Sequence, residues 1–298
     1  MGVNWNFSPK NQRENSNLFF VANKRLINKS NHQVIRCNLD DEELVRKVLL
    51  DFSINCIVNL FAITDLQKCE DNFLLCNEVN ALIPKKLLKI AKELSIDFVQ
   101  ISSDHLFNKD NDLIFEDDSP CPLNNYALTK YQAEKYSLSY DKSIVIRTNF
   151  FGWGTSYRKS LSDFLYYSLK GNKEIIGYND ILFNPVHVRT LIDIIYKLLD
   201  IGFYGLINVS SDFSISKYDF AYSLAKLFNL DLNYLKKGLY SNNNELSSLI
   251  RPKNMALSNS KLKKTLGIEN LTIDKELDIL KEELDSDFQR NLSEVVIL

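Results

Sequence analysis

The chain has 298 residues, of which 45% are hydrophobic and 25% charged, and its formal net charge is −2 at pH 7. These values are typical of a globular protein with a large core and exclude a disordered or fibrous chain. Because both charge signs are interspersed, we expect no nucleic-acid groove and no basic membrane-binding face. The longest apolar runs, such as residues 56–63, are too short to cross a bilayer, and the first ten residues lack a secretory pattern. We therefore expect a cytoplasmic protein.

The cysteines and histidines carry no sign of a covalent or metal framework. Five cysteines lie between Cys37 and Cys121, in apolar or helical contexts. An odd number in a cytoplasmic protein favours reduced, buried thiols. His105 and His187 have no partners at metal-ligand spacing, so we expect no metal site.

Short apolar runs that are typical of strands alternate along the chain with longer amphipathic runs that are typical of helices. We expect strands at residues 17–23, 55–62, 97–103, 143–151 and 205–211. We expect helices at residues 40–52, 80–94, 126–138, 161–175, 192–202 and 216–228, followed by a mixed, polar tail. This alternation predicts an α/β fold with a parallel sheet covered on both faces, the doubly wound Rossmann type.

The regular alternation of strand and helix patterns changes after residue 151, which predicts two structural units. Residues 1–151 with about 185–210 are expected to form a dinucleotide-binding domain. Residues 152–184 with 211–298 are expected to form a smaller substrate-binding lobe.

A candidate catalytic motif, Tyr-x-x-x-Lys, occurs four times: Tyr126/Lys130, Tyr131/Lys135, Tyr166/Lys170 and Tyr222/Lys226. About one such pair is expected by chance, so the motif alone identifies nothing. Position favours the first pair, because its helix follows a strand that ends in Ser102, Ser103 and Asp104, and parallel sheets bind ligands at that end. Tyr126 and Lys130 share a helix face, whereas the next pair lies about 140° around the helix. We interpret the other three pairs as solvated or packing positions.

The chemistry of such a trio is coherent. A free tyrosine has a pKa of about 10, and a nearby ammonium is expected to lower it toward the working range. A serine hydroxyl can polarise a substrate carbonyl. Ser103, Tyr126 and Lys130 therefore fit hydride transfer to or from a carbonyl beside a nicotinamide. The alternative is an ordinary helix start with an exposed tyrosine and lysine.

Longer segments carry a family resemblance. ISSDHLF…PCPLNNYALTKYQAEKY resembles the "STDxVF…PxNxYGxSKxxxE" block of extended short-chain dehydrogenases/reductases, and within them is most similar to the dTDP-4-dehydrorhamnose reductase group. IVNLFAITDLQKCEDNFLLCNEVNA resembles that group's "VINxAAxTxVDxCExxxxxAxxVN" segment. VIRTNFFGWG and IRPKNMALSNSKL resemble its later blocks, so the likeness runs from about residue 18 to 265.

The resemblance implies roles for individual residues. Ser103 would contact the substrate carbonyl, Tyr126 would be the general acid, and Lys130 would bind the cofactor ribose. The implied NADP- or NAD-binding residues are Gly2, Arg25, Asn38, Asn59, Ala62, Thr64, Lys130, Thr148 and Asn149, with Arg25 favouring NADP. Asp104 and Arg251 would face a nucleotide-sugar substrate, although Arg251 also reads as a surface arginine before a turn proline. A homodimer is compatible with the family.

One departure concerns the first strand. Members of this family begin with a strand and a Gly-x-x-Gly-x-x-Gly turn that holds the pyrophosphate. Here only Gly2 precedes Gly152, and residues 1–12 read as the first helix, with Gly2 aligned to the last glycine of the turn. We favour a chain that starts about ten residues late over a relative that has lost dinucleotide binding, because the catalytic block is intact. Either way, the central strand is missing, two apolar strand edges are left unpaired, and weak or no NADPH binding is expected.

Three functions remain open from the sequence. The first is an NAD(P)H-dependent reductase of a nucleotide-activated 4-keto sugar. The second is an epimerase or dehydratase of the same superfamily, which would recycle its cofactor. The third is a non-catalytic binding or regulatory protein on this fold, which the lost glycine turn favours.

Overall fold

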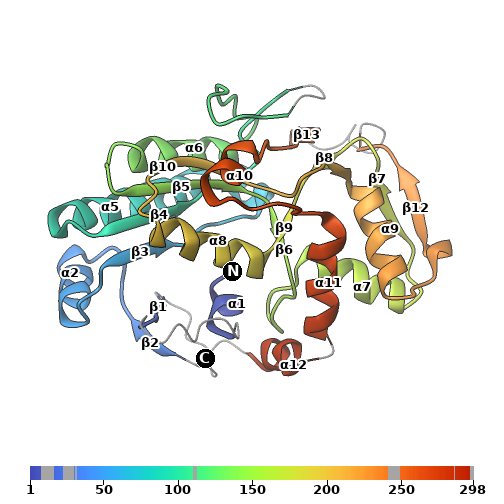
Figure 1. The fold of residues 1–298 in the computed structure, drawn as a ribbon, viewed down its shortest axis with the longest axis horizontal. Coiled ribbons are helices and arrows are strands. Elements are labelled where there is room, and N and C mark those ends of the chain that lie inside the picture. The colour runs from blue at the N-terminus through green and yellow to red at the C-terminus, as the bar shows by residue number, and fades with distance from the viewer. Residues whose placement is uncertain are drawn as a thin grey trace.

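The computed structural model describes residues 1–7, 17–22, 30, 32–109, 113–240, 249–284 and 286–295. Its centre is a four-stranded parallel sheet in the order β10–β5–β4–β3 (Figure 1). The strands are β3 (Cys56–Asn59), β4 (Asp97–Ile101), β5 (Ser143–Thr148) and β10 (Gly205–Val209). Each lies within a strand predicted from the sequence.

Helices cover both faces of this sheet. On one face, Phe98 of β4 shares an apolar cluster with α5 (Ile83–Leu94), and α6 (Asn125–Ser137) contacts β4 and β5. On the other face, Val99 and Ile101 pack with α8 (Val188–Asp200). Neighbouring residues of β4 thus point to opposite layers, as the two-residue repeat of a strand requires. The predicted doubly wound α/β fold is confirmed.

The remaining elements around the sheet begin with α1 (Gly2–Phe7), which contacts α8 as the predicted first helix. The others are β1 (Phe19–Ala22), β2 (Gln33–Arg36), α2 (Glu42–Asp51), α3 (Leu66–Asp71), α4 (Phe73–Asn77), a π-helix at Glu78–Leu82 and α10 (Ser260–Leu266). Strand β2 was not predicted, because its four residues are too short for a clear pattern. Pro84 occupies the first turn of α5, where a proline is tolerated.

A second lobe packs beside the sheet around Trp153, Phe183, Phe220 and Leu280 (Figure 1, right). It contains β6 (Phe150–Phe151), α7 (Leu161–Lys170), β7 (Ile175–Tyr178), β8 (Leu182–Phe183), β9 (Val186–His187), β11 (Ile215–Ser216), α9 (Lys217–Leu227), a 3-10 turn at Leu232–Tyr234, β12 (Leu235–Gly238), β13 (Asn254–Met255), α11 (Ile273–Leu284) and α12 (Asp287–Glu294). The helices after residue 260 were expected only as a polar tail. Leu262 of α10 lies in the range predicted for the substrate-binding lobe but packs with the sheet. The predicted domain boundaries therefore remain a proposal.

Strands β1 and β2 form a separate parallel pair. Within the described residues, β1 is hydrogen-bonded to β2 alone, and β3 to β4 alone. Among the described residues, no hydrogen-bonded strand joins the β1–β2 pair to β3, and the missing central strand stays a prediction.

The cysteine prediction was wrong in two respects. Cys69 and Cys76 form a disulfide between α3 and α4, with their Cα atoms 5.1 Å apart, and Cys121 is exposed. A single residue separates the two helices, so side chains seven positions apart in the sequence face each other. The number of cysteines in the sequence does not reveal such a pairing. No described helix is long and apolar enough to cross a membrane.

A buried ion pair joins β5 to α6. The guanidinium of Arg147 donates to both carboxylate oxygens of Glu134 at 3.0–3.2 Å, and the two side chains are 3% and 1% exposed. The Arg147 guanidinium also lies over the Phe107 ring and donates to the Glu116 carbonyl.

We expect Glu134→Ala to lower the free energy of unfolding by about 3–5 kcal/mol, because it leaves a buried guanidinium without its carboxylate. Urea unfolding followed by circular dichroism measures this. The matched control is Glu43→Ala, which removes an 88%-exposed carboxylate from an ion pair with Arg46 and should change little. Equal losses in the two variants would contradict the importance of the buried pair.

Candidate active site

The site is built on the carboxyl end of β4. Ser102, Ser103 and Asp104 follow the strand directly and are at most 5% exposed. The Ser103 hydroxyl donates to Asp104 Oδ1 at 3.3 Å and accepts from the backbone N–H of His105 at 3.2 Å. The Asp104 carboxylate also accepts from Asn149 Nδ2 at 2.7 Å. This network fixes the serine and the aspartate relative to the end of the sheet.

Helix α6 brings the predicted tyrosine and lysine to the same place. Its N-cap Asn124 accepts from the backbone N–H of Ala127 at 2.9 Å, which fixes where the helix begins. Tyr126 is 9% exposed, with the His105 ring edge-on at 5.8 Å between centroids. Lys130, 4% exposed, donates from Nζ to the Ile101 carbonyl at 2.6 Å. The lysine thus binds the strand that carries Ser103.

The other three Tyr-x-x-x-Lys pairs behave differently. In each of them the lysine ammonium lies over the ring of its own tyrosine: Lys135 over Tyr131 at 4.9 Å, Lys170 over Tyr166 at 5.2 Å and Lys226 over Tyr222 at 5.1 Å. Such local cation–π contacts are packing arrangements. Among these four pairs, only Tyr126/Lys130 directs both groups toward the end of the sheet, as position in the sequence predicted.

The acid–base properties of the pair differ from the expectation. Burial raises the pKa of Tyr126 to about 12, although the nearby Ser103 hydroxyl and the charge of Arg158 act in the opposite direction. Burial also lowers the pKa of Lys130 to about 8, partly offset by Glu134. The prediction that Lys130 lowers the pKa of Tyr126 was wrong for this structure, because the ammonium is engaged with the Ile101 carbonyl and desolvation dominates the phenol.

Several predicted cofactor residues lie at the ends of the neighbouring strands. Asn59 ends β3, donates to Gln100 Oε1 at 2.9 Å and accepts from the Phe61 N–H at 3.2 Å. Thr64 accepts a hydrogen bond from Arg158 at 2.5 Å. Thr148 ends β5 and is 3% exposed. Asn59, Thr148 and Asn149 thus follow or end strands at the same edge of the sheet as Ser103, whereas Thr64 lies in the loop after β3.

The remaining predicted cofactor residues are less constrained. Ala62 is half-buried in the loop after β3, and Asn38 is exposed after β2. A side chain built at Gly2 would only touch Leu60 at 3.6 Å, an ordinary contact, so the described protein atoms do not require glycine there. Arg25 lies outside the described residues. The roles of these four residues remain predictions.

A cluster of charges on the substrate side includes one residue that sequence reasoning missed. The ammonium of Lys217, at the start of α9, lies 3.2 Å from the centroid of the buried Phe183 ring. Its burial and the charge of Arg251 lower the pKa of Lys217 to about 7, against an opposing effect of Asp104. Arg251 is exposed, and no described carboxylate forms an ion pair with either cation. Nothing in the sequence around Lys217 signals this position, which depends on how the second lobe folds.

Burial also lowers the pKa of His105, with Lys217 and Arg251 contributing and Asp104 opposing. The three basic side chains therefore share one environment around a single carboxylate, which suits an anionic ligand.

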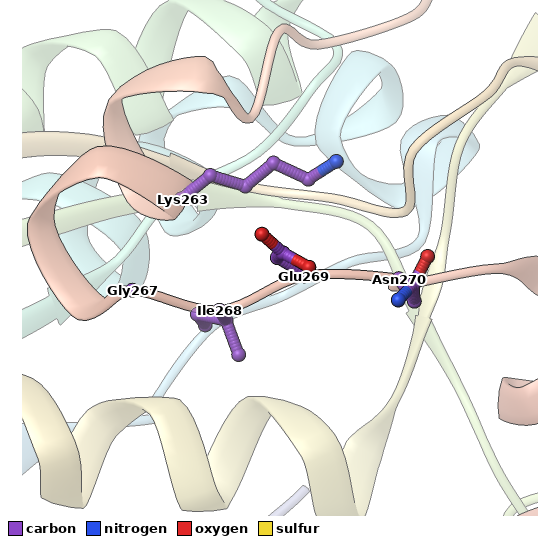
Figure 2. Close-up of a pocket in the computed structure, with 5 residues that line it drawn as sticks. All are labelled: Lys263, Gly267, Ile268, Glu269 and Asn270. Carbon is purple, nitrogen blue, oxygen red and sulfur yellow. The ribbon is translucent and has the colours of Figure 1, made fainter.

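A separate pocket of about 380 Å³ is lined by Lys263, Gly267, Ile268, Glu269 and Asn270 (Figure 2). None of these residues belongs to the predicted site, and Lys263 is already paired with Asp212 at 2.7 Å. We therefore assign this pocket no role. The described residues contain no group of three or more His, Cys, Asp or Glu side chains placed to hold a metal ion.

Comparison with known proteins decides the family. A family model described as the RmlD substrate binding domain matches residues 10–285. The chain belongs to this family. Among its relatives are the probable low-salt glycan biosynthesis reductase Agl14 of Haloferax volcanii, 23% identical over 84% of this chain and 83% of the relative, and the methionine adenosyltransferase 2 subunit beta of Rattus norvegicus, 27% identical over 79% and 72%. The resemblance stated from the sequence is confirmed.

Solved structures agree in fold. A dTDP-4-dehydrorhamnose reductase of Bacillus anthracis in complex with NADP has a TM-score of 0.79 at 21% identity, covering 95% of this chain and 97% of the other. A dTDP-4-dehydrorhamnose reductase of Clostridium acetobutylicum has a TM-score of 0.77 at 24% identity, covering 87% and 93%. At this identity the likeness shows the fold alone, which is that of Rossmann-type reductases.

The lowered pKa of Lys217 predicts a pH dependence of stability. The folded state releases this proton at about pH 7 and the unfolded state near 10.5, so the unfolded state binds more protons between these values. Stability should therefore rise with pH across this window. We expect Lys217→Met to flatten the rise in urea-unfolding free energy between pH 7 and 9.5, with a residual slope from Lys130. Lys226→Met, at an exposed position, is the control; equal slopes in all three proteins would contradict the buried environment of Lys217.

Proposed function

We propose that the chain is an NAD(P)H-dependent reductase of a nucleotide-activated 4-keto sugar, similar to dTDP-4-dehydrorhamnose reductases. The observation that carries the proposal is the buried placement of Ser103 and Tyr126 at the carboxyl end of β4, in a member of this family. Lys130, bound to the same strand, completes the trio that carbonyl reduction needs.

The raised pKa of Tyr126 suits the direction of reduction. A reduced carbonyl becomes an alkoxide that must receive a proton, and a phenol with a pKa of about 12 is protonated at neutral pH. Tyr126 can therefore donate its proton to the new hydroxyl, while Ser103 donates a hydrogen bond to the same oxygen as negative charge develops there. When bound, the nicotinamide cofactor supplies the hydride.

Polar atoms at the site remain available to ligands. Ser102 Oγ and His105 Nδ1 are buried and have no hydrogen-bond partner among the described residues. Buried polar atoms are normally satisfied, so unpaired ones beside Tyr126 favour a bound molecule. Asn59, Thr64, Thr148 and Lys130 would hold the nicotinamide half of NADP or NAD. Support for this cofactor comes from the NADP complex of the Bacillus anthracis reductase.

A second class of enzyme is compatible with the fold. A UDP-glucose 4-epimerase structure has a TM-score of 0.76 at 17% identity. Cofactor stoichiometry separates the two classes, because a reductase consumes one NAD(P)H per product whereas an epimerase or dehydratase regenerates its cofactor.

A third candidate is a subunit of another enzyme. The observation that favours it is the group of relatives named methionine adenosyltransferase 2 subunit beta, 25–27% identical over 79% of this chain. A cytoplasmic location and a homodimer stay predictions.

Tyr126→Phe tests the proposal because it removes the proton donor and little else. We expect NADPH oxidation with a dTDP-4-keto sugar to fall by about 10²–10⁴-fold, the usual contribution of a general acid. Tyr131→Phe, on the same helix but with its ring under Lys135, is the matched control and should keep turnover. Turnover that is unchanged in Tyr126→Phe would favour the subunit over the enzyme.

A further inference from the structure

His105 is a basic side chain beside the carbonyl-binding groups, and the proposed reduction gives it no chemical role. Its backbone N–H donates to the Ser103 hydroxyl at 3.2 Å, and its ring meets the Tyr126 ring edge-on, with 5.8 Å between the centroids. The imidazole therefore lies next to both residues that would hold the carbonyl oxygen of the substrate. A ketone bound by these two hydroxyls brings the carbons next to its carbonyl group close to this ring.

The Asp104 carboxylate orients the imidazole. Its Oδ1 atom lies 3.9 Å from His105 Nε2, and the carboxylate is itself held by Ser103 and Asn149. It favours the tautomer with the proton on Nε2, because this hydrogen then points at negative charge. The lone pair is left on Nδ1, which is buried and has no hydrogen-bond partner among the described residues. Such a nitrogen is free to accept a proton from a ligand.

The surroundings keep this base uncharged. Burial lowers the pKa of His105, and the charges of Lys217 and Arg251 act in the same direction, against Asp104. The imidazole is therefore neutral at neutral pH, the state in which it can accept a proton. Once it has accepted one, the adjacent carboxylate stabilises the imidazolium.

A base in this position has a chemical target in a ketone. A hydrogen on a carbon next to a carbonyl group is acidic, because the electron pair left behind is shared with the carbonyl oxygen as an enolate. Hydrogen-bond donors at that oxygen stabilise the enolate as they stabilise the alkoxide formed in reduction. The hydroxyls of Ser103 and Tyr126 would serve both reactions.

We propose that His105 removes and returns a hydrogen on a carbon next to the keto group, so that the chain enolises its sugar as well as reducing it. The C–H bond breaks, its proton moves to Nδ1, and the electron pair forms the carbon–carbon double bond of an enolate held by Ser103 and Tyr126. The reverse step returns a proton from the imidazolium to the same carbon. No oxidant, reductant or cofactor is consumed. The activity rests on the proposed 4-keto sugar as ligand, but not on hydride transfer.

Deuterium incorporation into the sugar tests this activity without NADPH. The full chain is incubated in D₂O with a dTDP-4-keto sugar and no added cofactor, and incorporation is followed by proton NMR and mass spectrometry beside a sample without protein. We expect the rate to exceed the spontaneous rate by about tenfold or more. His105→Gln should return it to the spontaneous rate, because a general base contributes about 10²–10⁴-fold. His32→Gln, the same substitution just before β2, is the matched control and should keep the parent rate.

Three results would overturn the proposal. The first is incorporation by the parent chain at the spontaneous rate. The second is incorporation by His105→Gln at the parent rate. The third is loss of incorporation in Lys217→Met but not in His105→Gln, which would assign the base to the lysine. Circular dichroism establishes that each variant is folded, and His105→Asn replaces His105→Gln if the latter is not.

The outcome is separable from that of the reductase test. Incorporation without NADPH oxidation would support enolisation and contradict the proposed reductase. NADPH oxidation without incorporation would support the reductase and contradict the role of His105.

Discussion

The site depends on one constraint, the common direction of the strands in the β10–β5–β4–β3 sheet. Parallel pairing places the carboxyl ends of β3, β4 and β5 at one edge, so Asn59, Ser103 and Thr148 meet there although they are distant in the chain. The crossover helices must return to the other end of the sheet after each strand. Helix α6 therefore begins at the same edge as these residues and carries Tyr126 in its first turn.

Desolvation then sets the chemical state of that edge. Burial raises the pKa of the Tyr126 phenol to about 12, against the expected direction, and lowers the pKa of the Lys130 ammonium to about 8. An exposed pair at this spacing would be governed by the charge of the lysine, but here the low polarity of the surroundings has the larger effect. The Tyr126 phenol is therefore protonated at neutral pH, which is the state that the proposed reduction requires.

Sequence periodicity predicted the sheet and its covering helices, because buried parallel strands and amphipathic helices both leave strong patterns in the residue types. The position of each pair relative to the predicted strands also selected Tyr126/Lys130 from four similar pairs, because this position can be determined from the sequence. Lys217 could not be predicted, because its contact with Phe183 is made between segments far apart in the chain. The Cys69–Cys76 disulfide and the raised pKa of Tyr126 were not predicted either, because cysteine pairing and side-chain burial are properties of the folded chain. Arg25 lies outside the described residues, so its role stays a prediction.

The ion pair between Arg147 and Glu134 has a consequence for the orientation of helix α6. Glu134 lies one turn beyond Lys130 on the inner face of α6, which continues to Ser137. Two contacts attach this face to the sheet: Lys130 donates to the Ile101 carbonyl at the end of β4, and Glu134 accepts from Arg147 of β5. Together they oppose rotation of the helix about its own axis. The direction in which Tyr126 points is therefore settled when the chain folds, before any substrate arrives.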